Sequence, residues 1–405
     1  MNRRNSSFLA GSLAAVWLCG MAAGCASETP ASVEERESTR TAPPALVGET
    51  PEPTADARFG FAVLGRLAAE REAGNILIAP RNIRTALAAI AVGAEGETES
   101  EILTRANRYD QIDNAPGKSF RNALHIWVWP GEVLKEDFRA HFRDARIDST
   151  APAEAPAVVN AYVRERTGGK IDDILTSPPE DIGIVLTTVF DFEGKWHLAF
   201  DPGQSRDDSF FATPQTPSAA RFMQRRGEFH YAETDEGQIA RLPYRDDGLV
   251  MTLFLPKASL RIDDWLRGTT GEAWQTLVET MAPRDGLLAL PRLKSLFSVE
   301  LAKPLQAVGI RRAFSKAAEF TGILQNSPPL KIDRVLHKAL LRIDEQGTEA
   351  AAATSIALRA MSMRINQPAP FEMKLDRPFF LTIGDAPNHK ILFMAVVRTP
   401  GEGRD

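Results

Sequence analysis

Cysteine is almost absent from this sequence of 405 residues, which contains only Cys19 and Cys25. Cys19 lies inside an apolar run near the N-terminus and Cys25 follows that run. The rest of the chain therefore offers no internal disulfide, thiolate metal site or cysteine nucleophile. Histidine is also sparse, and no two histidines have a spacing that places them on one helix face, so we expect no metal site. The six are His125, His141, His197, His230, His337 and His389.

The sequence also lacks the local motifs of common catalytic and nucleotide-binding sites. It contains no G-x-S-x-G elbow, no phosphate-binding loop and no dinucleotide fingerprint, so we expect no cofactor. The 48 basic and 53 acidic residues interleave without a basic stripe, which argues against nucleic acid as a partner. We expect a protein that is not an enzyme. An envelope hydrolase that uses one of the histidines stays an alternative, because a triad assembled from distant residues leaves no local motif.

The N-terminus has the pattern of an export signal. Arg3 and Arg4 precede an apolar run over residues 8–23, and small residues lead to Cys25. The tetrapeptide AAGC resembles a bacterial lipobox, with Ala22 where leucine is usual, and the resemblance implies lipidation of Cys25. We expect residues 1–24 to be a signal peptide and the mature chain to be lipid-anchored in the bacterial envelope or on the cell surface. Plain secretion and an uncleaved anchor are the alternatives.

Two segments of different composition follow. Residues 25–55 begin with Cys25 and continue as ASETPASVEERESTRTAPPALVGETPEPTA, which has too few large apolar residues to bury a core and predicts a disordered tether. Residues 56–405 start with helical periodicity and continue with short strands such as QIARLPYR, GLVMTLFLP, HKALLRID, FFLTIG and ILFMAVV. The absence of a regular βαβ alternation predicts one α+β domain with antiparallel sheets.

A bland stretch, DEQGTEAAAATSIALRAMSMRINQPAP, separates two of these strands. Its alanine run favours a helix by propensity alone. An extended chain is the other interpretation, because alternate residues then form one uncharged face and one face that carries both charges. The uncharged face is Thr348, Ala350, Ala352, Thr354, Ile356 and Leu358, and the other is Glu349, Ala351, Ala353, Ser355, Ala357 and Arg359.

The context of this stretch resembles the serpin family over residues 56–405. EQGTEAAAATS resembles the serpin hinge, VVNAYVRERTGGKI and TTVFDFEGKW resemble two further family segments, and LPYRDDGLVMTLFLP, AVGIRRAFSKAAEFTGI, VLHKALLRIDEQGTEA, LDRPFFLTI and ILFMAVVRTP follow in the family's order. The resemblance implies a fold of three mainly antiparallel sheets with about nine helices and an exposed reactive-centre loop. It also implies suicide inhibition of serine proteases through loop cleavage, acyl-enzyme trapping and insertion of the loop into the central sheet.

The resemblance assigns roles to particular residues. The scissile bond falls at Met361-Ser362, with Arg359 and Arg364 as alternatives for trypsin-like proteases. The hinge comprises Glu345, Gly347, Thr348, Glu349, Ala350, Ala351, Ala352, Ala353 and Thr354, and the breach and shutter under the central sheet comprise Trp196, His337, Thr188 and Asn82. Thr188 stands where asparagine is usual, and Ala79 and Asn82 stand where serines are usual. We therefore expect a rebuilt hydrogen-bond network in the shutter.

These assignments lead to a hypothesis about activity. The inward hinge residues are small or uncharged, which favours an active, monomeric inhibitor over a non-inhibitory serpin that serves as a binding module. Met361 suits elastase-like, chymotrypsin-like or subtilisin-like targets. We do not expect heparin to bind, because the stretch between Leu103 and His125 is short and the chain has no basic cluster.

Overall fold

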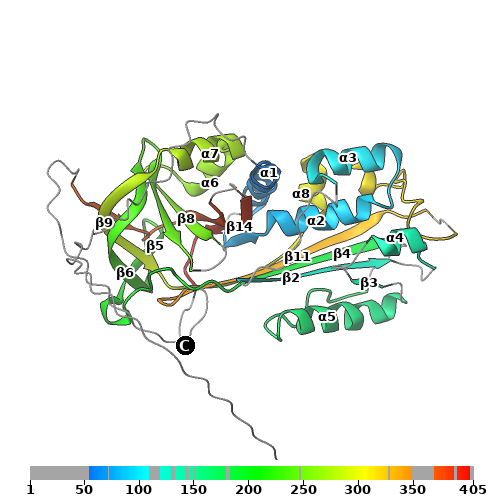
Figure 1. Cartoon of the computed structure of the whole chain (residues 1–405), viewed down its shortest axis with the longest axis horizontal. Helices are drawn as coiled ribbons and strands as arrows, with labels where there is room; N and C mark the ends of the chain where they lie inside the picture. Colours follow the sequence, from blue (N-terminus) through cyan, green and yellow to red (C-terminus); the bar gives the residue numbers. More distant parts are fainter. Residues whose placement is uncertain are drawn as a thin grey trace, which may run out of the picture. The chain divides into compact units, whose positions relative to one another are not determined.

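The computed structural model describes residues 54–71, 73–108, 119–128, 133–141, 146–148, 151–178, 183–245, 248–326, 329–347, 369–386 and 390–401 (Figure 1). All of these belong to one compact unit that extends from Pro51 to Asp405. Cys25 and the expected signal peptide and tether lie outside the described residues, apart from the last two positions of the tether, Thr54 and Ala55.

The described part of the chain contains eight α-helices, against the nine or so that the resemblance implies. None of the described helices is long and apolar enough to cross a membrane. The first helix begins after Thr54, whose side chain accepts a hydrogen bond from the backbone N of Ala57, a common N-terminal cap. The helices are α1 (Ala55–Glu70), α2 (Pro80–Ala91), α3 (Gly96–Ala106), α4 (Glu136–Ala140), α5 (Ala155–Arg166), α6 (Ile262–Gly268), α7 (Gly271–Glu279) and α8 (Ala302–Ala307).

A five-stranded sheet contains two of the described site residues, His337 and Thr188. Its strands, in spatial order, are β10 (Leu293–Glu300), β11 (Ile332–Ile343), β4 (Ile184–Phe192), β2 (Phe120–Val128) and β3 (Arg146–Asp148). The central pair, β11 and β4, is parallel, whereas β10 pairs antiparallel with β11 and β2 pairs antiparallel with β4. All nine residues of β4 are buried, as the continuous apolar sequence of this segment predicts.

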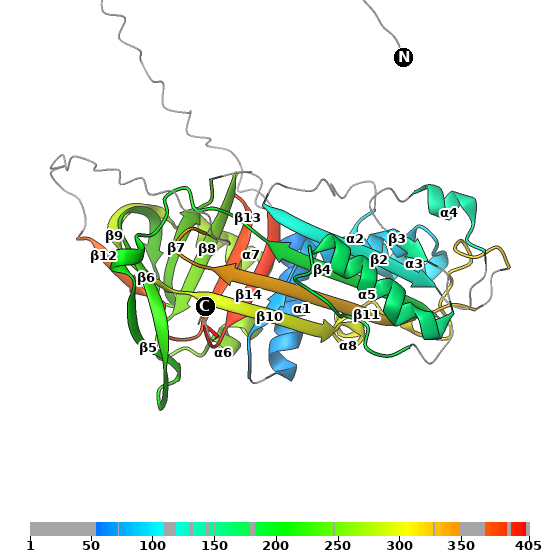
Figure 2. The ribbon, with the colours of Figure 1, turned by 90° about the horizontal axis from the view of Figure 1, so that it is seen from below.

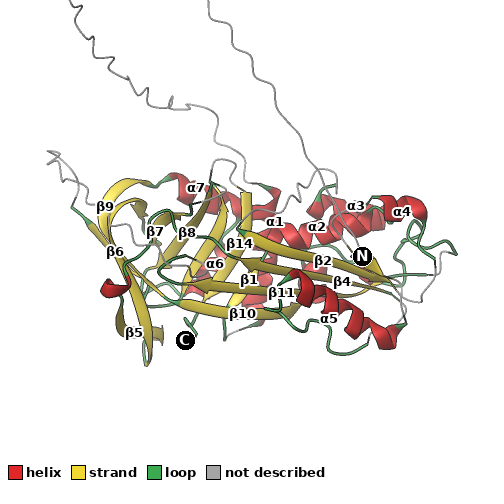
Figure 3. Ribbon diagram, turned by 60° about the horizontal axis from the view of Figure 1, so that its bottom comes forward, coloured by secondary structure: helices red, strands yellow, loops and turns green. Residues whose placement is uncertain are grey.

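A second sheet contains the remaining nine strands (Figure 3). Its order is β1 (Ile76–Ile78), β14 (Lys390–Val397), β13 (Phe379–Asp385), β8 (Leu249–Pro256), β7 (Gly237–Pro243), β6 (Thr216–Glu233), β9 (Ala282–Pro291) and β12 (Phe371–Lys374), with β5 (Arg206–Thr213) paired to β6. The 18-residue β6 pairs with β5, β7 and β9 and joins groups of strands that would otherwise be separate. In the described residues the hydrogen-bonded strands therefore form two sheets rather than three, and most of their pairs are antiparallel, as expected.

Helices cover both faces of the five-stranded sheet. In Figure 1, α2 and α3 lie above β4 and β11, and α5 lies below them; Figure 2 shows α5 across the sheet from the other side. The main hydrophobic core lies on the α2 side, and a smaller cluster lies between α5 and the opposite face. In that smaller cluster, Val159 and Val163 of α5 pack with Val185 and Val189 of β4.

A buried ion pair fixes the helices on the α2 side. Arg84 of α2 pairs with Asp56 at the start of α1, and their side chains are only 5% and 9% exposed. The Arg84 guanidinium also donates to the backbone carbonyls of Arg105 and Ala106, at 3.3 and 3.1 Å, where α3 ends. One guanidinium thus connects three helices and satisfies carbonyls at a helix end.

We predict that replacing Arg84 by methionine lowers the free energy of unfolding by about 3–5 kcal/mol, because it leaves the Asp56 carboxylate buried without its ion-pair partner. The midpoint of the first urea transition measures this. Arg58→Met is the matched control: Arg58 pairs with Glu272 at the surface, where both side chains are about half exposed, and its loss should cost less than about 1 kcal/mol. Equal effects of the two changes would contradict the structural role given to Arg84.

Candidate functional site

The structure brings the described site residues together in two places. Trp196, Glu345 and Gly347 meet where β11 ends, and His337, Thr188 and Asn82 meet midway along the pair of β11 and β4. The other residues that the resemblance assigns to the reactive loop and hinge lie outside the described residues. These are Thr348, Glu349, Ala350, Ala351, Ala352, Ala353, Thr354, Arg359, Met361, Ser362 and Arg364.

The chain reverses direction directly after β11. Asp344 and Gly347 pair as an antiparallel bridge, with hydrogen bonds from the N of Asp344 to the O of Gly347 (2.8 Å) and from the N of Gly347 to the O of Asp344 (3.2 Å). Gly347 has a φ of +142°, and a Cβ there would lie 2.0 Å from the carbonyl oxygen of Gly194. Only glycine fits this position, both for its backbone conformation and for the close approach to the chain beyond β4.

Trp196 packs against this turn and donates two hydrogen bonds to it. Its indole Nε1 donates to the carbonyl of Asp344 at 2.9 Å, and its backbone N donates to the carbonyl of Gln346 at 3.0 Å. The ring stacks on Tyr244, with centroids 4.5 Å apart and planes 14° apart. Burial of the turn raises the pKa of the Asp344 carboxyl. The turn is therefore a fixed part of the fold rather than the start of a free loop.

Glu345 is buried beside the turn, and both of its carboxylate oxygens accept hydrogen bonds. Its Oε1 accepts from the hydroxyl of Ser205 at 2.5 Å, and both carboxylate oxygens accept from Nε of Arg292, at 3.0 and 2.9 Å. Its backbone carbonyl accepts from the N of Phe200 at 2.8 Å. Sequence analysis assigned Glu345 to the hinge but did not find Ser205 or Arg292. A buried carboxylate requires a cationic partner, but nothing in the sequence distinguishes Arg292 from the other basic residues.

His337 is the centre of the second group and is completely buried. The backbone N of Ala79 donates to Nε2 at 3.2 Å, so Nε2 carries no proton in this arrangement. The neutral ring then carries its proton on Nδ1, which donates to Oγ1 of Thr188 at 2.8 Å. Burial lowers the pKa of His337 to about 3, so the ring is neutral at physiological pH.

The unusual residues of the shutter each have a defined contact. Ala79 acts through its backbone N, which donates to Nε2 of His337, and Oγ1 of Thr188 accepts the hydrogen bond from Nδ1 of the same ring. The two ring nitrogens of His337 bond to Ala79 and Thr188 rather than to Asn82, whose Nδ2 donates to the carbonyl of Val189 in β4 at 3.2 Å. The network thus connects α2 to both β4 and β11.

The directions of β11 and β4 determine how an additional strand could pair between them. Residues of β11 and β4 are direct neighbours from Arg334 to Leu341 of β11, for example His337 with Thr188 and Leu341 with Phe192. A strand that continued the pairing of the turn at Gly347 would run antiparallel to β11. It would then be antiparallel to β4 as well, because β4 and β11 are parallel. The seam between β4 and β11 is therefore a place where one strand could form two antiparallel ladders.

Within the residues that the structure describes, no group of three or more histidine, cysteine, aspartate or glutamate side chains could hold a metal ion. The polar groups at the turn and in the shutter bond mainly to one another and to the backbone. Their arrangement is that of a structural support for the sheet.

We predict that Thr188→Val lowers the free energy of unfolding by about 1–3 kcal/mol, because it leaves the Nδ1 proton of His337 buried without an acceptor. Thr187→Val is the control on the opposite face of the same strand. Thr187 is equally buried but makes only a 3.4 Å contact with the carbonyl of His125, so its loss should cost less. Urea unfolding of both variants measures the difference, and a larger effect at Thr187 would contradict the assigned network.

The lowered pKa of His337 also predicts that the free energy of unfolding depends on pH. Its pKa is about 3 in the fold and near 6.5 in an unfolded chain, so the unfolded state binds an extra proton between these values. The stability that the neutral ring contributes is complete above pH 6.5 and falls as the pH is lowered towards 3, by up to about 1.4 kcal/mol per pH unit. His337→Gln should lose this part of the slope in unfolding experiments between pH 6.5 and 4. His230→Gln, at an exposed position, should retain it.

Comparison with known protein families gives a match over residues 54–400 to the model described as "Serpin (serine protease inhibitor)". Among curated proteins, a serpin-like protein of Thermococcus kodakarensis is 30% identical over 353 residues, which cover 81% of this chain and 82% of the relative. Alpha-1-antiproteinase of Rattus norvegicus is 28% identical over 377 residues and covers 85% of this chain and 88% of the relative.

Solved structures share the fold. Human thyroxine-binding globulin superposes with a TM-score of 0.77 at 22% identity, over 86% of this chain and 98% of that structure. The thermophilic serpin tengpin, in its native state, superposes with a TM-score of 0.76 at 24% identity, over 85% of this chain and 93% of that structure. At these identities the likeness concerns the fold alone.

Proposed function

The chain belongs to the serpin family, and we propose that it is an irreversible inhibitor of serine proteases. A target protease attacks the reactive loop: its serine oxygen bonds to the carbonyl carbon before the scissile bond, and the new amine leaves with a proton. The acyl-enzyme is then trapped because the cleaved loop inserts between β4 and β11 before water hydrolyses the ester. Serpin loop insertion is an established example of strand addition to a sheet.

The observation that carries this proposal is the turn at Asp344–Gly347. It already pairs the chain with the end of β11 and directs it towards the seam between two parallel strands. Continuing the same pairing places Thr348 opposite Ile343, Ala350 opposite Leu341, Ala352 opposite Ala339 and Thr354 opposite His337.

The residues on that side of β11 are buried in or next to the main core, so an inserted side chain there must be small or uncharged. The sequence from Thr348 to Thr354 meets this condition. On the other face, the same register places Glu349 opposite Arg342, a favourable charge pair across strands. The hinge therefore fits both faces of the sheet in the register that the turn sets.

The energy available supports insertion. A strand of about a dozen residues adds ladder hydrogen bonds worth on the order of 1 kcal/mol each, or about 10 kcal/mol in all before side-chain packing. This gain is released only after cleavage separates the loop from the chain that follows it. The form with the loop outside the sheet would then persist because a kinetic barrier slows insertion, although its free energy is higher than that of the inserted form.

Target specificity follows from the reactive bond. Met361-Ser362 would present a long unbranched side chain to elastase-like, chymotrypsin-like or subtilisin-like pockets, and Arg359 or Arg364 would instead suit trypsin-like proteases. We further propose that the inhibitor is monomeric and that lipid on Cys25 attaches it to the bacterial envelope or cell surface, where it meets foreign or endogenous proteases.

Incubation with one protease of each of these four classes tests the proposal. We expect at least one protease to form a complex that survives denaturing gels, and mass spectrometry of the released C-terminal peptide to identify the cleaved bond. We also expect the heat resistance of the protein to rise strongly after loop cleavage. Cleavage with full recovery of protease activity in every class would instead support a non-inhibitory serpin that acts as a binding module.

A hinge variant sharpens this test. Thr348→Arg should leave the fold intact but convert the inhibitor into a substrate, because the charged side chain would have to enter the core beside Ile343. Thr348→Val, which has nearly the same shape without charge, should trap protease like the parent chain. The ratio of complex to cleaved inhibitor on gels measures both effects. Normal trapping by Thr348→Arg would show that the proposed inward register is wrong.

A further inference from the structure

One face of the nine-stranded sheet carries a continuous column of aromatic and arginine side chains. At one end of the column, the backbone N of Phe200 donates to the carbonyl of Glu345 at 2.8 Å. At the other end, the guanidinium of Arg284 donates to the carbonyl of Ala369. Glu345 and Ala369 lie on either side of the assigned reactive bond in the sequence, so the column joins the two attachments of the reactive loop.

The column alternates between strands and holds its arginines by ring contacts. The two pairs of rings have centroids 5.7 and 3.8 Å apart, and the guanidinium carbons lie between 4.8 and 5.4 Å from the rings that they cover. Rings on two sides of one guanidinium restrict its movement. The members, in order, are Phe200, Arg225 of β6, Phe229 of β6, Phe371 of β12, Tyr231 of β6 and Arg284 of β9.

Neither arginine of the column has a carboxylate partner in the part of the chain that the structure describes. Arg225 donates through Nη1 to the carbonyl of Leu198, a residue that is 51% exposed. Arg284 donates through Nε and Nη2 to the carbonyl of Ala369, at 3.1 and 2.8 Å. Burial lowers the pKa of Arg225 to about 10, so the group keeps its charge at neutral pH. Both guanidinium groups are therefore uncompensated charges with N–H donors to spare.

The acidic residues of the same strands do not supply this compensation. Glu228 of β6 and Asp285 of β9 are cross-strand neighbours at the position next to Arg284, so their side chains emerge on the opposite face of the sheet. Glu233 lies on the column side and accepts from the hydroxyl of Tyr231 at 3.3 Å. Among the described residues, however, no ion pair joins Glu233 to Arg284.

The sequence of the reactive loop adds positive charge and almost no negative charge. Residues 350–368 contain Arg359 and Arg364 but no aspartate or glutamate. Glu349 precedes this stretch, and its proposed place is opposite Arg342 in the inserted strand. A protease that attacks the loop would thus approach a cationic segment attached above two uncompensated guanidinium groups.

We propose that Arg225 and Arg284 are a docking site for carboxylate groups beside the active-site cleft of the target protease, and that they make the inhibitor selective for proteases with an acidic surface there. This inference rests on the proposed function and names the chemistry of its partner. A guanidinium binds a carboxylate through two parallel N–H bonds. Because the rings already restrict both side chains, they lose little further freedom when a carboxylate binds.

The test uses two trypsin-like proteases that cleave after arginine, one anionic and one cationic. Both should cut the loop at Arg359 or Arg364 whether or not the chain traps them. The measured quantity is the second-order rate constant for attack on the full chain, divided by that for a synthetic peptide of residues 350–368. We expect this ratio to be about threefold to tenfold higher for the anionic protease. The difference should shrink as the salt concentration rises from about 0.05 to 0.5 M.

Variants of the column assign the effect to its arginines. Arg225→Met and Arg284→Met should each remove part of the difference between the proteases, and the double variant should remove most of it. Methionine keeps apolar contact with the rings, and Arg225→Lys, which keeps the charge, should retain most of the parental difference. An unchanged ratio in the double variant would overturn the docking site.

Arg221→Met is the matched control. Arg221 lies four positions earlier on β6, and its charge is already paired with Asp207 at 3.3 Å. The control changes the net charge of the chain by the same amount as Arg225→Met, but it should affect the ratio much less. An equal or larger effect of Arg221→Met would overturn the proposal, because net charge alone would then explain the preference.

Trapping is scored in the same reactions and separates this inference from the proposed function. If both proteases cleave the chain without forming a stable complex while the ratio still depends on Arg225 and Arg284, inhibition of these proteases fails and the docking site stands. If a complex forms but the ratio is the same for both proteases, only the docking site is overturned. Urea unfolding of each variant ensures that the rates compare folded chains.

Discussion

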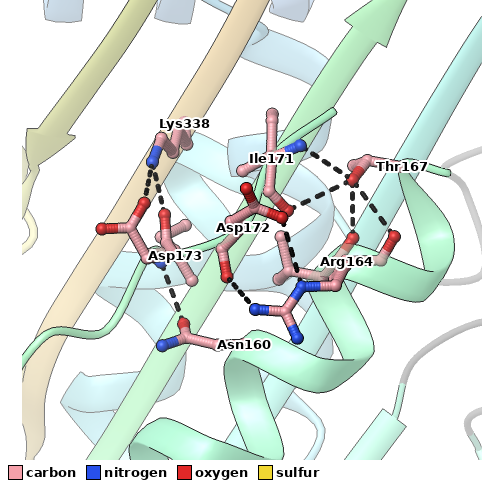
Figure 4. Close-up of polar contacts among 9 residues, drawn as sticks. Asn160, Arg164, Thr167, Ile171, Asp172, Asp173 and Lys338 are labelled. Carbon is pink, nitrogen blue, oxygen red and sulfur yellow. Dashed lines mark hydrogen bonds and ion pairs between the residues drawn. The ribbon is translucent and has the colours of Figure 1, made fainter. Parts of the chain in front are cut away.

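The parallel pairing of β4 with β11 is the constraint on which the rest of the site depends. Two parallel strands cannot be joined by a short turn, so the connection between them runs through a large part of the chain. That leaves the boundary between them without a local covalent link. It is held by its ladder, by the His337 network on the α2 side and, on the α5 side, by the hydrogen bond from Lys338 of β11 to Asp173 (Figure 4). The boundary between β4 and β11 is therefore stabilised by a neutral hydrogen-bond network on one face of the sheet and by an ion pair on the other.

The two holds differ in how they respond to their surroundings. On the α2 side, a neutral imidazole is completely buried and bonds to a backbone N and a hydroxyl, so solvent ions have little access to it. On the α5 side, a lysine lies beneath a largely exposed aspartate, so salt screens that contact more strongly. The buried His337 network therefore contributes to the stability of the sheet largely independently of salt. The contact between Lys338 and Asp173 responds to ionic strength, because Asp173 is exposed to solvent.

Much of the fold could be predicted from the sequence because its strands are strongly apolar and well punctuated. The segments QIARLPYR, GLVMTLFLP, HKALLRID, FFLTIG and ILFMAVV correspond to β7, β8, β11, β13 and β14. The continuity of β6 was not predicted, because Arg225, Arg226 and Gly227 interrupt its apolar pattern at a point where the strand nevertheless continues. Within the site, Glu345, Trp196 and His337 were assigned by family resemblance. Their partners Arg292 and Ser205 were not, since contacts between segments far apart in sequence leave no local pattern.

The turn at Gly347 has a consequence for how a strand would form in the seam. Closing a long loop normally carries an entropic cost before any contact repays it. Here the closure is already complete in the closed sheet, since Asp344 and Gly347 are paired and Trp196 holds the turn from below. Each further residue would then add to an existing hairpin and lose only its own freedom. In the proposed insertion, the new strand would grow from a nucleus that is already part of the fold, in one direction, from the turn towards His337.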